Sequence, residues 1–384
     1  MNVAVRKTYK YRLYRNDKRD RHLHDAINIS GIIWNHCIAL QRRYYRMFGG
    51  YISSVRLKKH IAKLRNSQRY SYWRKVGSQA VQDIIERLDK SYQMFFKKRG
   101  GRPSFTKVKK YRSFTLKQAG WKLLGGNKIR LGKTTYKFVN HRPIGGTIKT
   151  VTVKRDTIGR LWLCFSVIED VEIPEASTGQ VGGFDFGLKT FLTDHNGKAY
   201  MSPEYFKQKL SRIKRLNRSL SRKRKGSCNR AKTKYLLART HIRIDDKRKD
   251  FHYQLAHDLC DQFDILVFED LNIDGMKRLW GRKVSDLGFA QFVEIVQWVA
   301  TKRGKQVIFI DRFEPSSQVC SSCGTKQKLT LAERTYRCDC GLALDRDHNA
   351  AINIQRIGAS MHTARGVVRP ASRAALATAD AQAL

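Results

Sequence analysis

Apolar side chains recur along this chain with two different spacings. Residues 1 to 14 alternate between basic positions and apolar or aromatic ones, which predicts a strand with one charged face. From about 17 to 96 the apolar residues are mostly three, four or seven positions apart, which predicts a bundle of helices. From 113 to 173 short β-type runs are separated by glycine turns. This part of the chain therefore predicts a small antiparallel barrel or sheet.

A second series of elements begins after 175 to 179, which has the composition of a linker. Their order is strand, hairpin, helix, strand, helix, strand, helix, which is the order expected of an RNase H-like fold. The predicted positions are 181–187, 190–197, a helical pair over 206–249 broken near Gly226, a helix over 252–263, and then 265–268, 289–304, 307–310 and 349–354. After Gly358 the helical periodicity is lost, so we expect the tail to be disordered.

Basic residues outnumber acidic ones over most of the chain. The 384 residues include 77 lysines and arginines against 32 aspartates and glutamates, a formal net charge of +45. Such a charge repels itself strongly unless it faces a polyanion. Membranes and acidic proteins are alternative polyanions, but the interleaving of basic residues with Tyr, Phe and Trp favours nucleic acid.

Two stretches concentrate this charge. Half of the residues from 97 to 112 are Lys or Arg, with glycines and aromatics between them, and we interpret this segment as a phosphate-binding loop and not as a solvated linker. The helical pair from 205 to 249 carries 18 basic residues against two aspartates, which indicates an element that binds the phosphate backbone of nucleic acid. The candidate phosphate contacts are Lys97, Lys98, Arg99, Arg102, Lys109, Lys110, Arg222, Lys223 and Arg224.

Four polar residues of the N-terminal helical region have two interpretations. Their side chains are either solvated or directed at base edges, and spacing alone favours solvation. They are Asn28, Asn35, Gln79 and Gln82.

Four of the eight cysteines form two close pairs, Cys320/Cys323 and Cys338/Cys340, each followed by glycine. Two turn-borne thiolate pairs supply the tetrahedral ligand set that structural zinc prefers. The second pair is one residue tighter than usual, so His348 or a water is an alternative fourth ligand. Reduced free thiols are the alternative to a metal site. The chain shows neither a signal peptide nor an apolar run long enough to span a bilayer, so we expect a soluble intracellular protein.

Three carboxylates stand out by position. Asp185 lies in the first strand of the second series, Glu269 ends a later strand and Asp347 opens the last helix. Carboxylates among apolar neighbours are costly unless they bind metal, and two Mg²⁺ ions between them would support phosphodiester cleavage. Singly, each acid has the alternative of a cap or a surface charge. Their neighbours have simpler explanations. Asp270 is expected to cap the following turn, and Asp345 either to pair with Arg346 or to cap the helix.

Four segments resemble the TnpB family of transposon-associated, RNA-guided DNA endonucleases, which is similar to type V CRISPR effectors. They are FDFGLKT at 184–190, VFEDLNI at 267–273, PSSQVCSSCG at 315–324 and DRDHNAA at 345–351. The resemblance covers about residues 5 to 358. It implies that Asp185, Glu269 and Asp347 form a RuvC-like catalytic triad binding Mg²⁺, and that Gln82 contacts a short target-adjacent DNA motif.

The resemblance also assigns the domains of an α+β multidomain chain. An oligonucleotide-binding-like β-barrel (1–16 and 97–175) would carry an inserted helical recognition domain (17–96). An RNase H-like, RuvC-type nuclease domain (180–313 and 341–358) would carry a zinc knuckle (314–340), before the disordered tail (359–384). The implied partners are a guide RNA and double-stranded DNA, with no membrane, and the implied state is a monomer with RNA in the prokaryotic cytoplasm, at the nucleoid.

The leading hypothesis is therefore an RNA-guided, Mg²⁺-dependent DNA endonuclease with a structural zinc, encoded by a transposable element. If base pairing with the guide RNA recognises the target sequence, the protein needs only to bind phosphates. This would explain a net charge of +45 in a chain without a base-reading motif. The alternatives are a nuclease-inactive RNA-guided regulator, which predicts the loss of a triad acid, and a strand-transfer transposase or its accessory protein, which predicts RNA-independent binding to element ends. A structure-selective junction nuclease is a fourth possibility.

Overall fold

The computed structural model describes residues 2–172, 179–330 and 333–365. The chain divides into two compact units, Ala4–Asp170 and a C-terminal unit from Val171 that also takes Met1–Val3. The fold is α+β, as predicted, with both units mixing helices and sheets. Within the described ranges, no helix has the length and apolar content that crossing a bilayer requires.

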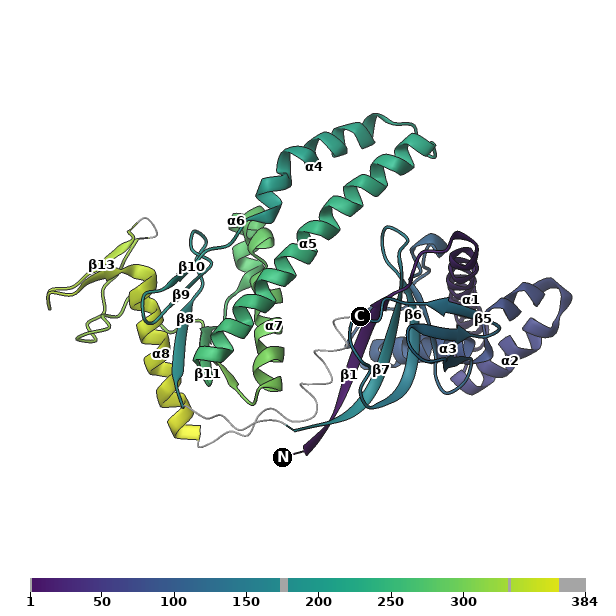
Figure 1. The fold of residues 1–384 in the computed structure, drawn as a ribbon, viewed down its shortest axis with the longest axis horizontal. Helices are drawn as coiled ribbons and strands as arrows, with labels where there is room; N and C mark the ends of the chain where they lie inside the picture. The colour runs from purple at the N-terminus through teal and green to yellow at the C-terminus, as the bar shows by residue number, and fades with distance from the viewer. Residues whose placement is uncertain (1, 173–178, 331–332, 366–384) are drawn as a thin grey trace. The chain divides into compact units, whose positions relative to one another are not determined.

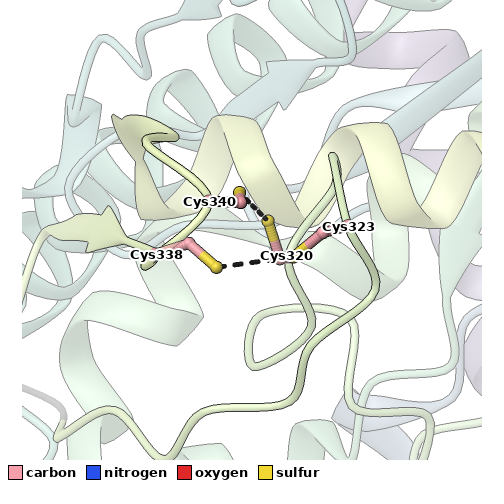
Figure 2. Close-up of side chains that lie close together, drawn as sticks. All are labelled: Cys320, Cys323, Cys338 and Cys340. Carbon is pink, nitrogen blue, oxygen red and sulfur yellow. Dashed lines mark hydrogen bonds between the residues drawn. The ribbon is translucent and has the colours of Figure 1, made fainter.

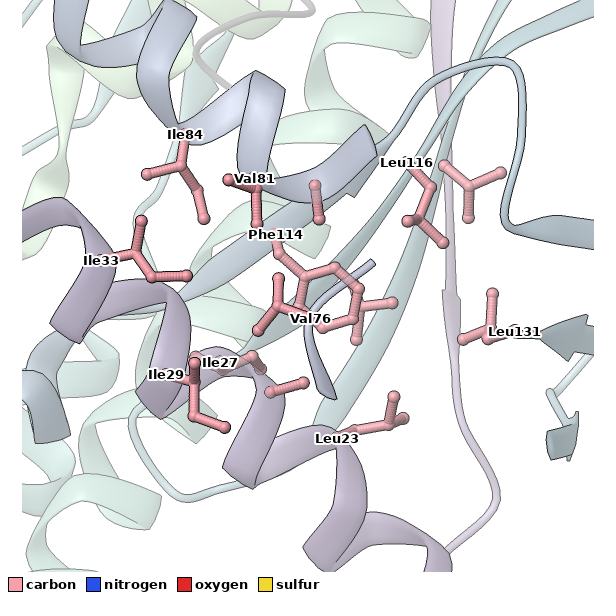
Figure 3. Close-up of a cluster of buried hydrophobic side chains, with 14 of the residues drawn as sticks. Leu23, Ile27, Ile29, Ile33, Val76, Val81, Ile84, Phe114, Leu116 and Leu131 are labelled. Carbon is pink, nitrogen blue, oxygen red and sulfur yellow. The ribbon is translucent and has the colours of Figure 1, made fainter. Parts of the chain in front are cut away.

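The N-terminal unit contains the predicted helices. They are α1 (Asp17–Phe48), α2 (Ser54–Asn66) and α3 (Ser78–Phe96), with short 3₁₀ segments at Gln68–Lys75 and Val108–Lys110. Asn16 and Ser53 accept hydrogen bonds from the first turns of α1 and α2, and Gly49 ends α1 at φ 65°, a conformation that glycine adopts without strain. Side chains such as Ile27, Ile33 and Ile84 pack with Phe114 of strand β2 into one core (Figure 3).

An open sheet supports these helices. Its order is β1-β7-β6-β2, formed by Asn2–Arg12, Leu161–Glu172, Thr147–Arg155 and Ser113–Leu116. A separate sheet joins β3 (Trp121–Leu123), β4 (Lys128–Leu131) and β5 (Thr134–Lys137). The predicted closed barrel is not found among the described residues. The strand pattern was compatible with either a barrel or a sheet, and strand pairing decides between them.

Two of the polar residues that we interpreted as solvated are structural. Asn35 donates to the carbonyl of Thr106 (2.8 Å) and accepts from its amide (2.9 Å), while Asn28 accepts from Arg155 (3.0 Å). Asn35 thereby fixes part of the basic segment 97–112 to α1. The solvated interpretation is therefore wrong for both asparagines.

The C-terminal unit is built on a five-stranded sheet of order β10-β9-β8-β11-β12. The strands are Ala199–Tyr200, Leu192–Asp194, Val181–Asp185, Ile265–Glu269 and Gln306–Ile310. Strand β8 pairs parallel with β11 and antiparallel with β9, and β11 pairs parallel with β12. The predicted strands and their order are confirmed, although the helix at Ile273–Leu287 was not predicted, and β8 lies at the centre of the sheet.

Helices cover the two faces of this sheet. On one face, Phe184 and Phe268 pack with α5 (Cys228–Gln262) and α7 (Phe289–Lys302). On the other, Ile265, Val267 and Ile310 pack with Ile354 of α8 (Arg346–Arg365). A further helix, α6 (Ile273–Leu287), departs from helical geometry at Trp280.

Glycines allow α8 to approach the sheet closely. A Cβ on Gly183 would lie closer than 3.0 Å to the backbone of Gln355 and Ala351, and one on Gly358 would lie equally close to Val267. Neither glycine has the positive φ that would by itself require glycine. Their role is therefore steric, because a side chain at either position would separate helix and sheet.

The basic helical pair is present as α4 (Tyr205–Arg222) and α5, which form a long hairpin (Figure 1). Its turn includes Gly226 at φ 90°. Helix α5 runs without a break through the helix predicted separately at 252–263. At the base of the hairpin, buried Asp286 of α6 accepts from the amides of Phe206 (2.9 Å) and Lys207 (3.1 Å) and so caps α4.

The cysteine segment forms a small lobe with the hairpin β13 (Thr335–Arg337) and β14 (Ala343–Asp345). Helix α8 follows directly and continues to Arg365, so the prediction that helical structure ends at Gly358 is wrong for residues 359–365. The rest of the predicted disordered tail lies outside the described residues.

Candidate functional site: three carboxylates beside a cysteine cluster

Two of the candidate catalytic acids are neighbours at one edge of the sheet. Phe184 pairs in register with Phe268, so Asp185 and Glu269 come next on adjacent parallel strands, which are about 4.8 Å apart. Side chains alternate between the faces of a sheet. Since Phe184 and Phe268 face α5 and α7, both carboxylates are on the face that α8 covers.

The third acid enters from the start of α8. Asp347 lies in its first turn, and its Oδ2 atom would be 3.3 Å from a Cβ placed on Gly187, two residues after Asp185. The side chain of Asp347 therefore lies over the segment that leaves β8. The close packing of α8 on Gly183 sets this arrangement, because it fixes the helix against the strand that ends in Asp185.

The pKa values of all three carboxyl groups are raised. Burial, together with the negative charges of Asp347 and Glu269, raises the pKa of Asp185 to about 8. Burial also raises the pKa of Glu269, with Asp270 contributing, and that of Asp347, with Asp345 contributing. Burial and two nearby negative charges both disfavour the charged form of Asp185, and a hard divalent cation bound beside it would compensate this cost.

The two acidic neighbours have other partners. Asp270 forms an ion pair with Arg312 across the ends of β11 and β12, while the cap of α6 is Asn272. Asp345 accepts from the amides of Asp347 (2.9 Å) and His348 (3.3 Å), so it caps α8. Of the two alternatives for Asp345, the cap is confirmed, and the turn cap expected of Asp270 is wrong.

The four cysteine sulfurs lie within 4.8 Å of one another (Figure 2). The Sγ atoms of Cys320 and Cys340 are 3.7 Å apart and those of Cys323 and Cys338 are 3.5 Å apart. A zinc–thiolate tetrahedron with bonds of about 2.3 Å has sulfur–sulfur edges of about 3.8 Å. The cluster therefore fits a zinc ion. His348 lies elsewhere, with its Nε2 atom 3.2 Å from the carbonyl of His195.

Both thiolate pairs are carried on glycine turns. The amide of Gly324 donates to the carbonyl of Cys320 (3.0 Å), and that of Gly341 donates to Cys338 (2.9 Å). Both glycines have positive φ, 80° and 94°. The shorter spacing of Cys338 and Cys340 is therefore accommodated by a turn at Gly341, and both sulfurs still reach the cluster.

Sequence reasoning missed the residues that join this cluster to α8. Asn349, Asn353 and Arg356 all contact the backbone of the segment 316–321. The available signal was two asparagines four positions apart in an otherwise apolar helical pattern, which places them on one face.

The candidate nucleic-acid contacts are mostly at the surface. Gln82 is exposed on α3, and so are the basic side chains of the first group. In the second group Arg222 and Arg224 are exposed, but Lys223 is half-buried and donates to the Thr233 hydroxyl, closing the α4–α5 turn. The members of the first group are Lys97, Lys98, Arg99, Arg102, Lys109 and Lys110.

Three family models match parts of this chain. Residues 164–279 match "Probable transposase", residues 289–354 match "Cas12f1-like, TNB domain", and residues 1–50 match "Helix-turn-helix domain". In this structure residues 2–48 form strand β1 and the single long helix α1.

Two relatives span nearly the whole chain, and a third spans part of it. A "Putative RNA-guided DNA endonuclease" of Streptomyces pristinaespiralis is 29% identical over 380 residues, 96% of this chain and 94% of that protein. A protein named "Putative RNA-guided DNA endonuclease InsQ" from Escherichia coli K12 is 24% identical over 371 residues, 91% of this chain and 92% of the relative. "TnpB-like protein L79" of Acanthamoeba polyphaga mimivirus is 30% identical over 244 residues, 58% of this chain and 46% of the relative.

The fold also has a solved counterpart. The structure described as "Cryo-EM structure of the Cas12f1-sgRNA-target DNA complex" superposes with a TM-score of 0.58 at 13% identity, covering 92% of this chain and 99% of that one. The sequence matches confirm the resemblance to the TnpB family that the motifs predicted. The structural match shows a likeness of fold alone.

Proposed function

We propose that this chain, which is similar over nearly its whole length to proteins named as RNA-guided DNA endonucleases, is itself an RNA-guided, Mg²⁺-dependent endonuclease that cuts double-stranded DNA. It acts with a guide RNA and is encoded by a transposable element. The observation that carries the proposal is that Asp185 and Glu269 end adjacent strands, and that the charges of Glu269 and Asp347 are close enough to raise the pKa of Asp185.

The three carboxylates are the metal-binding and catalytic groups of this proposal, in a RuvC-like domain of RNase H-like fold. Strand β8 supplies Asp185, the adjacent parallel strand supplies Glu269, and α8 supplies Asp347 from above them. Mg²⁺ bound there, as one or two ions, would activate water and stabilise the leaving oxygen of a phosphodiester. The residues of this chain hold the carboxylates on one face and keep them partly away from solvent.

The basic surfaces serve the nucleic acids. Exposed lysines and arginines of segment 97–112 and of the α4–α5 turn bind phosphates, and the RNA supplies sequence recognition by base pairing. Gln82, exposed on α3, is the candidate contact to the target-adjacent motif. The domain boundaries predicted from the sequence are part of this proposal. They are 1–16 with 97–175, 17–96, 180–313 with 341–358, and 314–340.

The cysteine cluster holds a structural zinc in this proposal. With all four thiolates as ligands no position is left open for a substrate, so the metal shapes the lobe and takes no part in the reaction.

The proposal is tested by cleavage with protein purified together with its RNA. Plasmids carrying a guide-matched target beside a randomised flank are incubated with Mg²⁺, and the Asp185→Ala variant is run in parallel. We expect cleavage of matched plasmids only, enriched for one flanking motif and absent in the variant, while RNA binding is unchanged. Tight matched binding without cleavage would support the nuclease-inactive regulator, and binding that ignores RNA would support the transposase.

A further inference from the structure

The α8 side chains that contact the cysteine lobe form a single row. Asn349, Asn353 and Arg356 are spaced by four and three positions, so they lie on one face of the helix. The two asparagines are almost fully buried, with exposed fractions of 0% and 5%. A buried amide is costly unless its hydrogen bonds are made, and here they are made to the backbone around the first thiolate pair.

Asn349 holds the backbone on both sides of Cys320. Its Nδ2 atom donates to the carbonyl of Val319 (2.8 Å), and its Oδ1 atom accepts from the amide of Ser321 (2.9 Å). Cys320 is itself fully buried, and its Sγ is 3.4 Å from the amide of Ser322. The conformation of the ligand-bearing turn is therefore tied directly to one helical side chain.

The same side chain belongs to the first turn of α8, two residues after Asp347. That turn is fixed in two further ways, because Asp345 caps it and His348 contacts the carbonyl of His195 in the β9–β10 turn. Within this turn, Asn349 is thus the residue that hydrogen-bonds the backbone around Cys320. Asn353 contacts the same lobe, at the carbonyls of Ser316 and Val319, but one helical turn farther from Asp347.

We propose that Asn349 is a positioning residue that couples the metal-closed shape of the cysteine lobe to the carboxylate of Asp347. This inference rests on the proposed function of the triad. A metal at the four sulfurs fixes the turn around Cys320, the turn fixes Asn349, and Asn349 fixes the direction in which α8 presents Asp347. Coupling of this kind is reciprocal, so cation binding at the triad also favours metal binding at the cysteines.

A double-mutant cycle on cleavage tests the coupling. The Mg²⁺ concentration for half-maximal guided cleavage is measured for the wild type, Asn349→Ala, Cys323→Ser and the double variant. Each single change should raise it about tenfold, the scale seen when groups that support metal ligands are removed. The double variant should be no worse than the worse single one, because both changes break the same link. Multiplication of the two effects, to about a hundredfold, would refute the coupling.

Asn353→Ala separates positioning from stability. It removes a buried amide with two hydrogen bonds to the same lobe, so its melting temperature should fall about as much as that of Asn349→Ala. Its Mg²⁺ requirement should stay within about twofold of the wild type, because the first turn keeps its contact through Asn349. Equal Mg²⁺ shifts in the two variants would show that Asn349 is only structural.

A second readout does not depend on cleavage. The zinc dissociation constant is measured by competition with a chromophoric chelator, with and without saturating Mg²⁺. Mg²⁺ should tighten zinc binding several-fold in the wild type and in Asn353→Ala, but not in Asn349→Ala. A wild type that shows this effect and cuts no matched DNA would refute the guided nuclease while supporting the coupling. An undiminished effect in Asn349→Ala would refute the coupling alone.

Discussion

The contact between Gly183 and α8 offers a sharp test of how Asp347 is held. In Gly183→Ala the new methyl would lie closer than 3.0 Å to backbone atoms of Gln355 and Ala351, whereas ordinary contacts begin at 3.4 Å. Backbone atoms of a helix have no rotamer to change, so α8 must retreat by more than 3.4 − 3.0 = 0.4 Å. Catalytic groups tolerate displacements of only about 0.5 Å, and a shift of about 1 Å costs about a hundredfold in rate.

We therefore expect Gly183→Ala to cut matched plasmid about 10 to 100 times more slowly than the wild type while binding guide RNA normally. Overpacking of this kind costs about 1–3 kcal/mol, so the melting temperature should fall by roughly 5 °C. Gly281→Ala is the matched control, since a Cβ there meets nothing within 4 Å and the residue lies in helix α6. Cleavage by Gly183→Ala within twofold of Gly281→Ala would refute the proposed role of this packing.

Two further predictions concern metal and pH. Cys320→Ser should lose zinc and have a lower melting temperature, since a metal-closed lobe gains much of its stability from the metal. Metal analysis and calorimetry measure the two effects. A wild type without zinc, and a variant with an unchanged melting temperature, would contradict the prediction. Burial lowers the pKa of His252 to about 4. The unfolded chain, with an imidazole pKa near 6.5, then binds this proton more tightly than the folded one, so the stability contributed by His252 is lost as pH falls from about 6.5 to 4, by up to about 3 kcal/mol. Comparison with His252→Gln by urea unfolding should show the difference shrinking over that range, and a difference independent of pH would contradict the assignment.

Hydrophobic periodicity was sufficient to predict the elements that carry the three acids. Strands β8 and β11 are short apolar runs ending in Asp185 and Glu269, and parallel pairing brings such ends to one edge of a sheet. The cysteine spacing likewise predicted a cluster, and the sulfurs do converge. In both cases the signal is local, because ligand types and element ends can be read within a few residues.

Features that depend on tertiary pairing were not predictable in this way. Apolar and polar residues alternate along the N-terminal strands, as they would in a barrel or in an open sheet. The observed strand order, β1-β7-β6-β2, is that of an open sheet. Spacing alone assigned Asn35 to solvent and gave Asn349 no role, yet each hydrogen-bonds backbone far along the chain, at Thr106 and around Cys320. The close approach that makes Gly183 important is invisible until α8 is docked.

The proposed nuclease activity depends most directly on Asp185, Glu269 and Asp347 forming one metal centre. Binding of Mn²⁺ to the RNA-bound protein, followed by electron paramagnetic resonance, measures this directly, with Asp185→Asn, Glu269→Gln and Asp347→Asn as nearly isosteric variants. We expect saturable binding in the wild type and at least tenfold weaker binding in every variant, because each removes one charged ligand from a shared site. Wild-type affinity in any one variant would show that its carboxylate lies outside the centre and would contradict the account.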